Sequence, residues 1–407
     1  MRNVELLMPA GNLEKLKYAV KYGADAVYLG VVDFSLRAMR KGEIITLENL
    51  KSAIDLAHSL GAKAYLTLNI FAFNSDIKHL ESCMEILKDA NPDAVLVSDF
   101  GILRLLKKYM PDTEIHVSTQ TNILNYECVK FWQDMGATRV VLARELSIPE
   151  IAEIKRQVPD MEIECFVHGS QCVSFSGRCL LSNYLVNRDA NRGECAQPCR
   201  WEYALMEVKR DGMYFPIQDS KEGTYILNSK DMCMIEHIPE MVEAGISSFK
   251  IEGRAKSAYY AAVITNAYRV AIDEYLKNPS KDFTPPQWVI DEVYKVSYRD
   301  YCTGFYFNAP NEDANISFEG GYKRHYDVMA EVKDCKDGFI IAEQRNKFCK
   351  GDTLDALQPS TEPVIFTADE IFDGDGNEIE AAPHPMMTVK IKSDLVFPKG
   401  TLLRKEK

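Results

Sequence analysis

The sequence predicts a (β/α)8 TIM-type barrel with a Cys-rich insertion, followed by a small C-terminal antiparallel β-barrel domain. Eight short runs rich in β-branched and apolar residues recur over the first 280 residues, and amphipathic stretches separate most of them. A doubly wound open sheet is the alternative, but the glycine-rich phosphate and dinucleotide fingerprints of such sheets are absent. After about residue 325 the pattern changes to short alternating runs separated by turns, which indicates antiparallel strands.

The expected strands of the barrel lie at residues 4–9, 26–30, 64–69, 94–99, 114–119, 139–144, 163–168 and 248–253. The clearest expected helices lie at residues 12–23, 47–61 and 76–90. Glycines 23, 61 and 136 mark helix ends, because each is followed closely by the next strand. We therefore expect the barrel to occupy residues 1–280, a Pro-rich linker or extension 281–324, and the β-domain 325–407. That domain could contact RNA or act as a passive lid.

The composition excludes several broad classes of protein. The 407 residues include 48 basic and 60 acidic side chains, giving a net charge of −12. A general nucleic-acid coat or a protein that binds anionic membranes needs a basic surface, although a local basic patch is still compatible with this charge. No apolar run is long enough to span a membrane, and the first residues lack the apolar core of a signal peptide. We expect a cytoplasmic protein.

One crossover of the predicted barrel is unusually long. About 80 residues separate the seventh and eighth strands, and six of the eleven cysteines lie between Cys165 and Cys233. Long insertions are usually functional, and an insertion after a barrel strand lies over the mouth where active sites form. We therefore expect a functional Cys-rich insertion at about residues 168–235. The scattered cysteines are expected to be small buried side chains, namely Cys83, Cys128, Cys302, Cys335 and Cys349.

Three kinds of site could explain the clustered cysteines. Zinc ribbons use CxxC pairs, which the chain lacks, and a catalytic thiol needs only one activated cysteine. An iron–sulfur cluster needs four thiolates and tolerates irregular spacing. The spacing favours a cluster and leaves zinc open, with five candidate ligands: Cys172, Cys179, Cys195, Cys199 and Cys233.

Polar residues close most of the predicted strands. Any one of them could be a helix cap or the start of a loop, but their recurrence at the same end of the strands favours a shared polar pocket. We expect this pocket to include Asn69, Ser98, Asp99, Ser118, Thr119, Gln120, Arg144, Glu145, His168, Lys250, Glu252 and Arg254. Two further arginines lie in adjoining loops, Arg37 after the second strand and Arg178 inside the insertion.

Several long motifs resemble peptidase family U32, the collagenase-like peptidases. They are "ELLMPAGNLEKLKYAVKYGADAVYLG", "ECFVHGSQCVSFSGRCLLS", "NRGECAQPCRWEY", "NSKDMC" and "KIEGR", and together they extend over nearly the whole chain. One departure is Gln171, where the family usually has an apolar residue. The family's name implies a protease, whereas its bacterial branches include RNA hydroxylases and ubiquinone-pathway hydroxylation proteins that carry a 4Fe-4S cluster. The resemblance places the cluster ligands at Cys172, Cys179, Cys195 and Cys233, with Cys199 as an alternative to Cys195.

The residues favour a redox function over a peptidase. The HExxH motif of metalloproteases is missing, and a Cys172–His168 protease pair would leave the other cysteines unexplained. The chain length and the C-terminal β-domain are similar to the branch that converts the wobble uridine of tRNA to 5-hydroxyuridine with prephenate as hydroxyl donor. A peptidase and a non-catalytic iron–sulfur partner in a quinone-type hydroxylation pathway remain the alternatives.

These interpretations assign roles to individual residues. Prephenate is a dicarboxylate, so its site should present cations at the barrel mouth. We expect catalytic roles for His168, Arg144, Glu145 and Glu252. We expect contacts to tRNA or to the small dicarboxylate from Arg37, Asn69, Ser118, Gln120, Arg178, Lys250 and Arg254. We also expect the sulfurs of the four cluster ligands to converge even without iron.

Overall fold

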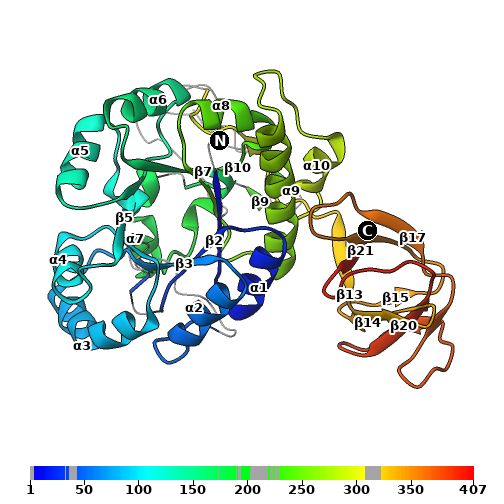
Figure 1. Ribbon diagram of the computed structural model, residues 1–407. Helices are drawn as coiled ribbons and strands as arrows, with labels where there is room; N and C mark the ends of the chain where they lie inside the picture. The colour runs from blue at the N-terminus through cyan, green and yellow to red at the C-terminus, as the bar shows by residue number, and fades with distance from the viewer. Residues whose placement is uncertain are drawn as a thin grey trace, which may run out of the picture.

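The first part of the chain is a closed barrel of eight parallel strands (Figure 1). The computed structural model describes residues 4–32, 34–35, 44–172, 174–188, 190, 194–201, 219–220, 223–224, 229–307 and 322–407. The eight strands of the barrel are β1 (Glu5–Pro9), β2 (Ala26–Leu29), β3 (Lys63–Leu68), β4 (Ala94–Val97), β5 (Glu114–Val117), β6 (Arg139–Val141), β7 (Glu162–Ser170) and β11 (Ser248–Ile251). Each pairs in parallel with the next, and β11 pairs with both β7 and β1, which closes the barrel. The predicted fold class and all eight predicted strands are confirmed.

Helices surround this barrel and bury its outer face. They are α1 (Leu13–Lys21), α2 (Leu50–Ser59), α3 (Asn74–Ala90), α4 (Phe100–Tyr109), α5 (Tyr126–Asp134), α6 (Ile148–Gln157), α8 (Ile238–Glu243) and α9 (Ala258–Lys277). Local sequence sets their ends: the Asn12 side chain accepts a hydrogen bond from the Lys15 amide at 2.9 Å, which caps α1. The glycines predicted to end helices, at positions 23, 61 and 136, all have positive φ.

The insertion after β7 begins with the short helices η2 (Phe175–Gly177), α7 (Leu181–Val186) and η4 (Pro198–Arg200). The two-residue strands β8 (Asp219–Ser220) and β9 (Gly223–Thr224) pair with each other, and η5 (Ile235–His237) precedes α8. The insertion returns to the barrel through β10 (Asp231–Cys233), which pairs antiparallel with the last residues of β7. The insertion is thus anchored at both ends to the same strand.

Residues 281–307, within the predicted linker or extension, pack against the barrel. Here α10 (Gln287–Glu292) is followed by β12 (Tyr301–Cys302), which pairs with β10. Val289, Val293 and Val296 belong to the core of the barrel. Arg299 is buried and forms an ion pair with Asp231 of β10 at 2.6 Å. This segment therefore braces the end of the insertion.

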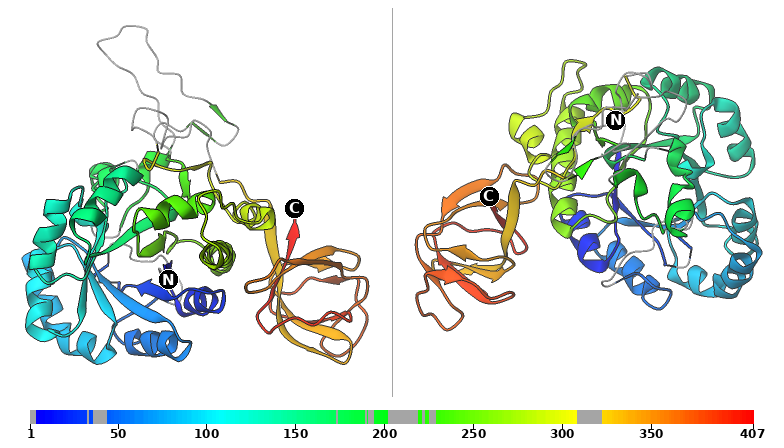
Figure 2. Two further views of the ribbon diagram at one scale, coloured as in Figure 1. Left: turned by 45° about the horizontal axis from the view of Figure 1, so that its top comes forward. Right: turned by 180° about the vertical axis from the view of Figure 1, so that it is seen from behind.

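The C-terminal domain is an antiparallel half-barrel with its own hydrophobic core (Figure 2). Its seven-stranded sheet has the order β17 (Val364–Thr367), β16 (Thr353–Leu357), β21 (Leu402–Glu406), β13 (Tyr326–Lys336), β14 (Phe339–Gln344), β20 (Thr388–Lys392) and β18 (Ile371–Phe372). A second pair is formed by β15 (Phe348–Cys349) and β19 (Ala381–Ala382). The predicted switch to antiparallel strands near residue 325 is confirmed.

The C-terminal domain is fixed to the barrel by buried polar contacts. The Arg404 guanidinium pairs with Glu292 of α10 at 2.6 Å, and both side chains are buried. Tyr22 follows α1, and its hydroxyl donates a hydrogen bond to the Leu357 carbonyl at 3.0 Å. Leu357 and Leu402 also join the core of the barrel. These contacts make the domain a fixed neighbour of α1, α9 and α10.

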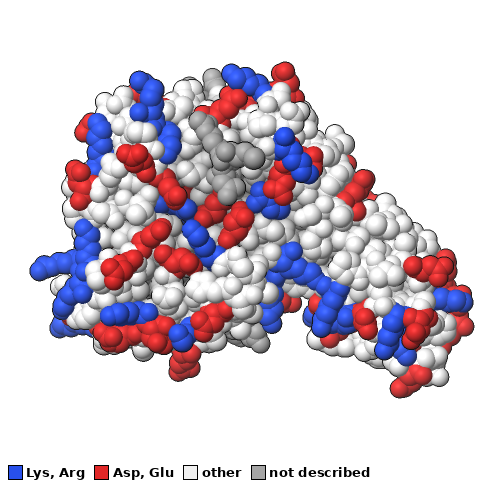
Figure 3. Space-filling view, viewed as in Figure 1, with Lys and Arg blue, Asp and Glu red and all other residues white. Residues whose placement is uncertain are grey.

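Acidic and basic side chains alternate over the surface in the view of Figure 3, on the barrel and on the C-terminal domain alike. This mixture agrees with a net charge of −12 carried by 48 basic and 60 acidic residues. Among the described residues, no helix is both long and apolar enough to cross a membrane.

Candidate functional site

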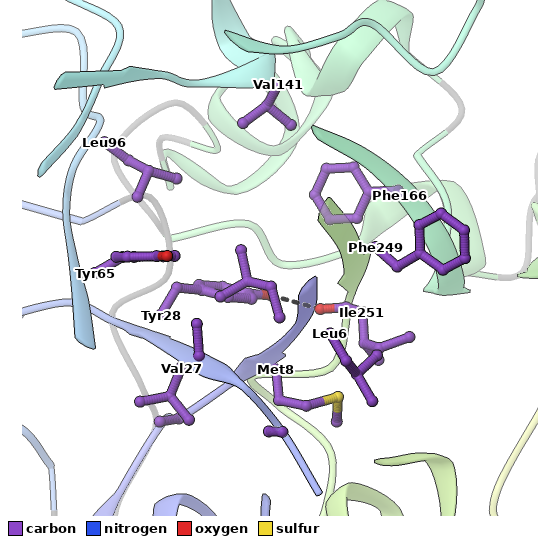
Figure 4. Packing of buried hydrophobic residues seen from close by; sticks show 14 of the residues in the cluster. Leu6, Met8, Val27, Tyr28, Tyr65, Leu96, Val141, Phe166, Phe249 and Ile251 are labelled. Carbon is purple, nitrogen blue, oxygen red and sulfur yellow. Dashed lines mark hydrogen bonds between the residues drawn. The ribbon is translucent and has the colours of Figure 1, made fainter. Parts of the chain in front are cut away.

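The interior of the barrel below the mouth is closed by side chains. Figure 4 shows Tyr28, Tyr65, Leu96, Val141 and Phe166 gathering between the strands that carry them, and it marks the hydrogen bond from the Tyr28 hydroxyl to the Ile251 carbonyl. Packing of this kind makes the barrel interior a core, so that ligands can bind only at its end.

A buried ion network forms the floor of the site. Lys250 lies 2.6 Å from Glu164, and Arg139 lies 3.2 Å from the same carboxylate. Burial opposes ionisation of Glu164, but Lys250 and Arg139 together hold its pKa below the ordinary value. Lys250 was predicted to bind substrate, and the structure instead places it in this ion pair beneath the rings of Tyr28 and Phe166.

Uncharged polar side chains occupy the part of the mouth formed by the ends of β3, β4 and β5, which we call the neutral half. The Asn69 amide donates a hydrogen bond to the Ser118 hydroxyl at 3.2 Å. Ser98 and Gln120 are also buried, and Ser98 Oγ and Gln120 Oε1 have no hydrogen-bond partner among the described residues. Arg178 of the insertion donates two hydrogen bonds to the main-chain carbonyl of Gln120, at 2.9 and 2.7 Å. The structure therefore brings the predicted residues Asn69, Ser118, Gln120 and Arg178 together.

Charged residues lie at the ends of β6, β7 and β11, which we call the charged half, and the Arg254 side chain extends from there to β3. Arg254 is 5% exposed and donates hydrogen bonds to Ser35 at 2.6 Å and to Thr67 at 3.3 Å. Glu252 is also 5% exposed and lies 3.5 Å from the Tyr28 hydroxyl. Both residues were predicted for the site, and both are enclosed by contacts from β2, β3 and the loop after β2.

Arg144 and Glu145 connect the charged half to the insertion. The Arg144 guanidinium stacks on the Phe166 ring at 3.9 Å and donates one hydrogen bond to the Ser170 carbonyl at 3.3 Å. Its Nε is buried and has no acceptor among the described residues. Glu145 accepts hydrogen bonds from the amide and the hydroxyl of Ser176, at 2.6 and 2.7 Å. Glu145 thus holds the insertion in place, while Arg144 retains unused donors.

The His168 side chain was predicted at the mouth of the barrel, but it points toward α9. A bulge between β7 and β11 pairs Phe166 with Lys250 but His168 with Ile251, so that one residue of β7 has no opposite partner. The bulge reverses the alternation of side chains and turns the His168 ring toward α9, where it contacts Tyr260 and Tyr268. Burial lowers the pKa of His168 to about 3, so the ring is neutral. This environment does not support a role as a general base at the mouth.

The predicted cluster ligands occupy two places. The Cys172 thiol is half-buried, and burial raises its pKa, with smaller contributions in the same direction from Cys179 and Cys195. These three thiols are therefore electrostatic neighbours. Burial also raises the pKa of Cys233 to about 12, and this thiol neighbours Cys302.

The expected convergence of the four sulfurs on an iron–sulfur cluster stays a prediction. Within the described part of the chain, no three His, Cys, Asp or Glu side chains are placed to hold a metal ion. The antiparallel register of β10 and β7 places Cys233 opposite His168, four residues before Cys172. The donor chemistry of the four thiols suits a 4Fe-4S cluster.

Arg37, which was predicted to bind substrate, lies outside the described residues. Ser98, which was predicted for the polar pocket, is buried. The sequence did not point to Ser35, Thr67 and Ser176, which hold the charged residues in place. Thr67 could have been found, because it precedes Asn69 by two positions and so lies on the same inward face of β3.

Comparison with known proteins identifies the chain's relatives. The sequence pattern described as Peptidase family U32 matches residues 11–316, and that of the Peptidase family U32 C-terminal domain matches residues 324–404. The tRNA hydroxylation protein P1 of Bacillus subtilis (strain 168) is 40% identical over 406 residues, covering 99% of this chain and 95% of that protein. The tRNA hydroxylation protein P of Escherichia coli (strain K12) is 36% identical, covering 98% and 96%. A protein of Porphyromonas gingivalis (strain ATCC BAA-308 / W83) named Collagenase is 33% identical, covering 91% and 90%. With both family patterns matched and relatives aligned over nearly its full length, the chain belongs to peptidase family U32.

Proposed function

We propose that this chain is an RNA-modifying hydroxylase that acts on tRNA. The observation that carries the proposal is the full-length similarity to two relatives named for tRNA hydroxylation, which extends through both domains. The mouth of the barrel suits such a reaction, because it offers uncharged polar groups on one half and guanidinium groups on the other. A nucleobase and a small anion could thus bind side by side.

The finer proposal is conversion of the wobble uridine to 5-hydroxyuridine with prephenate as the hydroxyl donor. Prephenate carries two carboxylates, and guanidinium groups bind carboxylates through paired hydrogen bonds. Arg144 supports this assignment because its Nε is buried and has no acceptor among the described residues. Arg254 lies in the charged half, where its cation would add to the attraction.

We further propose that Cys172, Cys179, Cys195 and Cys233 bind a 4Fe-4S cluster, which would supply one-electron transfer. Anaerobically purified protein should contain about four irons and four sulfides per chain. Alanine at any of the four positions should remove the visible absorption, whereas Cys83→Ala should not. Stoichiometric zinc without labile sulfide would contradict the proposal.

A peptidase is the second candidate, because one relative is named Collagenase. A cysteine protease needs a thiol of low pKa beside a histidine. The pKa of Cys172 is instead raised by burial. The two ring nitrogens of His168 lie 3.4 Å from the hydroxyls of Tyr268 and Tyr301. The pair considered from the sequence is therefore not assembled as a protease site.

Nucleoside analysis separates the two functions. In a strain that lacks the gene for this chain, digested tRNA should have lost 5-hydroxyuridine and its derivatives, and a plasmid copy should restore them. Unchanged 5-hydroxyuridine derivatives in the deletion strain would refute the hydroxylase. Hydrolysis of gelatin by the purified protein, abolished by substitution of one named residue, would favour the peptidase.

A further inference from the structure

We infer that the neutral half of the mouth reads the hydrogen-bonding edge of a uracil ring, with Gln120 and Ser98 as the residues that select it over cytosine. This inference rests on the proposed function and deepens it, because it names the groups that choose the base. It starts from two buried polar atoms, Ser98 Oγ and Gln120 Oε1, that have no partner among the described residues.

The strand register directs Ser98 and Ser118 into the mouth. Leu96 pairs with His116, whose ring packs against Tyr65 inside the barrel. Ser98 and Ser118 follow two positions later on their strands, so they lie on the same inward face one layer nearer the mouth. Ser98 is 6% exposed and Gln120 is 9% exposed. A buried polar atom without a partner is unfavourable, which indicates that a ligand completes the hydrogen bonding here.

The hydrogen bond from Asn69 determines whether the Ser118 hydroxyl donates or accepts. The Asn69 amide donates to Ser118 Oγ at 3.2 Å, and no described residue accepts the Ser118 hydroxyl proton. Ser118 therefore presents a donor to the site. Gln120 presents a carbonyl acceptor and an amide donor side by side, as every glutamine amide does.

This arrangement matches uracil. A uracil ring presents a carbonyl acceptor, an N–H donor and a second carbonyl acceptor along one edge. The side-chain carbonyl of Gln120 can accept a hydrogen bond from the ring N–H. The side-chain NH2 of Gln120 and the serine hydroxyls can donate to the ring carbonyls. In the same pose, cytosine would place its unprotonated ring nitrogen opposite the Gln120 side-chain carbonyl and its amino group opposite a serine donor. To pair with cytosine, the Gln120 amide would have to turn over and the serine hydroxyl would have to become an acceptor.

A carboxylate is the other polar ligand to consider for the neutral half. It would face the unpartnered Gln120 Oε1, which repels an anion because it can only accept hydrogen bonds. Arg178 approaches the same residues, but it directs Nε and Nη2 at the Gln120 main-chain carbonyl. Arg144, whose buried Nε has no acceptor among the described residues, makes the charged half the better place for a carboxylate, so the neutral half is assigned to the base.

The test is RNA binding by the full-length protein, measured by fluorescence anisotropy. The probes are three anticodon stem-loop RNAs that differ at one loop position, which is uridine, cytidine or N3-methyluridine. The unsubstituted protein should prefer uridine over both others by about tenfold, the discrimination expected of one bidentate base contact. Gln120→Leu should abolish this preference, and Ser98→Ala should reduce it. The control Gln133→Leu, at an exposed position of α5, should keep it.

Three other outcomes are distinguishable. If Gln120→Leu and Ser98→Ala unfold at the same temperature as the unsubstituted protein and keep its full preference for uridine, the inference is overturned and the proposed function stands. If the unsubstituted protein binds the three RNAs equally while still hydroxylating tRNA, the inference alone is again overturned. If it neither binds nor modifies tRNA, the proposed function itself fails.

Discussion

Replacement of Arg144 by methionine tests whether the charged half of the mouth binds the anionic co-substrate. Methionine has a similar length and can keep the contact with the Phe166 ring, while the charge and the hydrogen-bond donors are lost. Among the described residues the guanidinium has one hydrogen-bond acceptor, the Ser170 carbonyl at 3.3 Å, and it stacks on Phe166 at 3.9 Å. The fold therefore loses little, about 1 kcal/mol for one hydrogen bond.

The effect on the reaction should be larger than the effect on stability. A hydrogen bond to a charged group contributes about 1.5–3 kcal/mol, which corresponds to a loss of roughly one to two powers of ten in co-substrate affinity. Hydroxylation should therefore fall steeply at limiting prephenate and recover in part as prephenate is raised. Arg144→Lys should recover less than full activity, because an ammonium cannot form the paired contact of a guanidinium.

The assay is mass spectrometry of nucleosides from undermodified tRNA incubated with each variant over a range of prephenate concentrations. Arg104→Met, at an exposed position of α4, is the matched control and should behave as the unsubstituted protein does. Normal hydroxylation by Arg144→Met at limiting prephenate would show that Arg144 does not bind the donor, and the donor site would then lie elsewhere.

Two further predictions concern the strand that carries the insertion. Burial lowers the pKa of His168 to about 3 in the folded protein, whereas the pKa is about 6.5 in the unfolded chain. Between these two values the unfolded state binds more protons than the folded state. The protein therefore loses stability as the pH falls from about 6.5 toward 3. His168→Phe should reduce the loss of stability between pH 7 and pH 5 in denaturant unfolding, and an unchanged loss would show that another group is responsible. Gly169→Ala should destabilise the fold by at least about 2 kcal/mol more than the control Gly338→Ala. The φ angle is +104° at Gly169, and an added Cβ would lie 2.2 Å from the Glu252 carbonyl oxygen. At Gly338 no atom lies within 4 Å of such a Cβ. Equal unfolding free energies for the two variants would contradict this account of the close approach between β7 and β11.

The sequence predicted the barrel well because its strands leave a strong local pattern. Runs such as "AVYL" and "AVLV" are buried on both faces, as parallel strands inside a layer of helices must be. The polar strand ends were also predicted as neighbours, because the carboxyl ends of parallel strands in a closed barrel lie at one rim. Asn69, Ser118 and Gln120 meet there, as expected.

Longer-range geometry could not be predicted in the same way. The bulge that turns His168 toward α9 depends on the register between β7 and β11, and no local pattern in the chain marks it. The pairing of β10 with β7, which places Cys233 opposite His168, joins segments that are more than 60 residues apart. Ser35 holds Arg254 through a contact between the loop after β2 and the loop after β11, which are far apart in the sequence.

The most direct test of the central claim is reconstitution of the reaction with the purified protein. The protein, prepared without oxygen and supplied with iron and sulfide, would be incubated with prephenate and with tRNA from a strain lacking its gene. We expect uridine in the anticodon to gain one oxygen atom as 5-hydroxyuridine, and omission of the protein to abolish this product. Absence of any hydroxylated nucleoside from a correctly folded preparation that contains the cluster would contradict the claim that this chain is a tRNA hydroxylase.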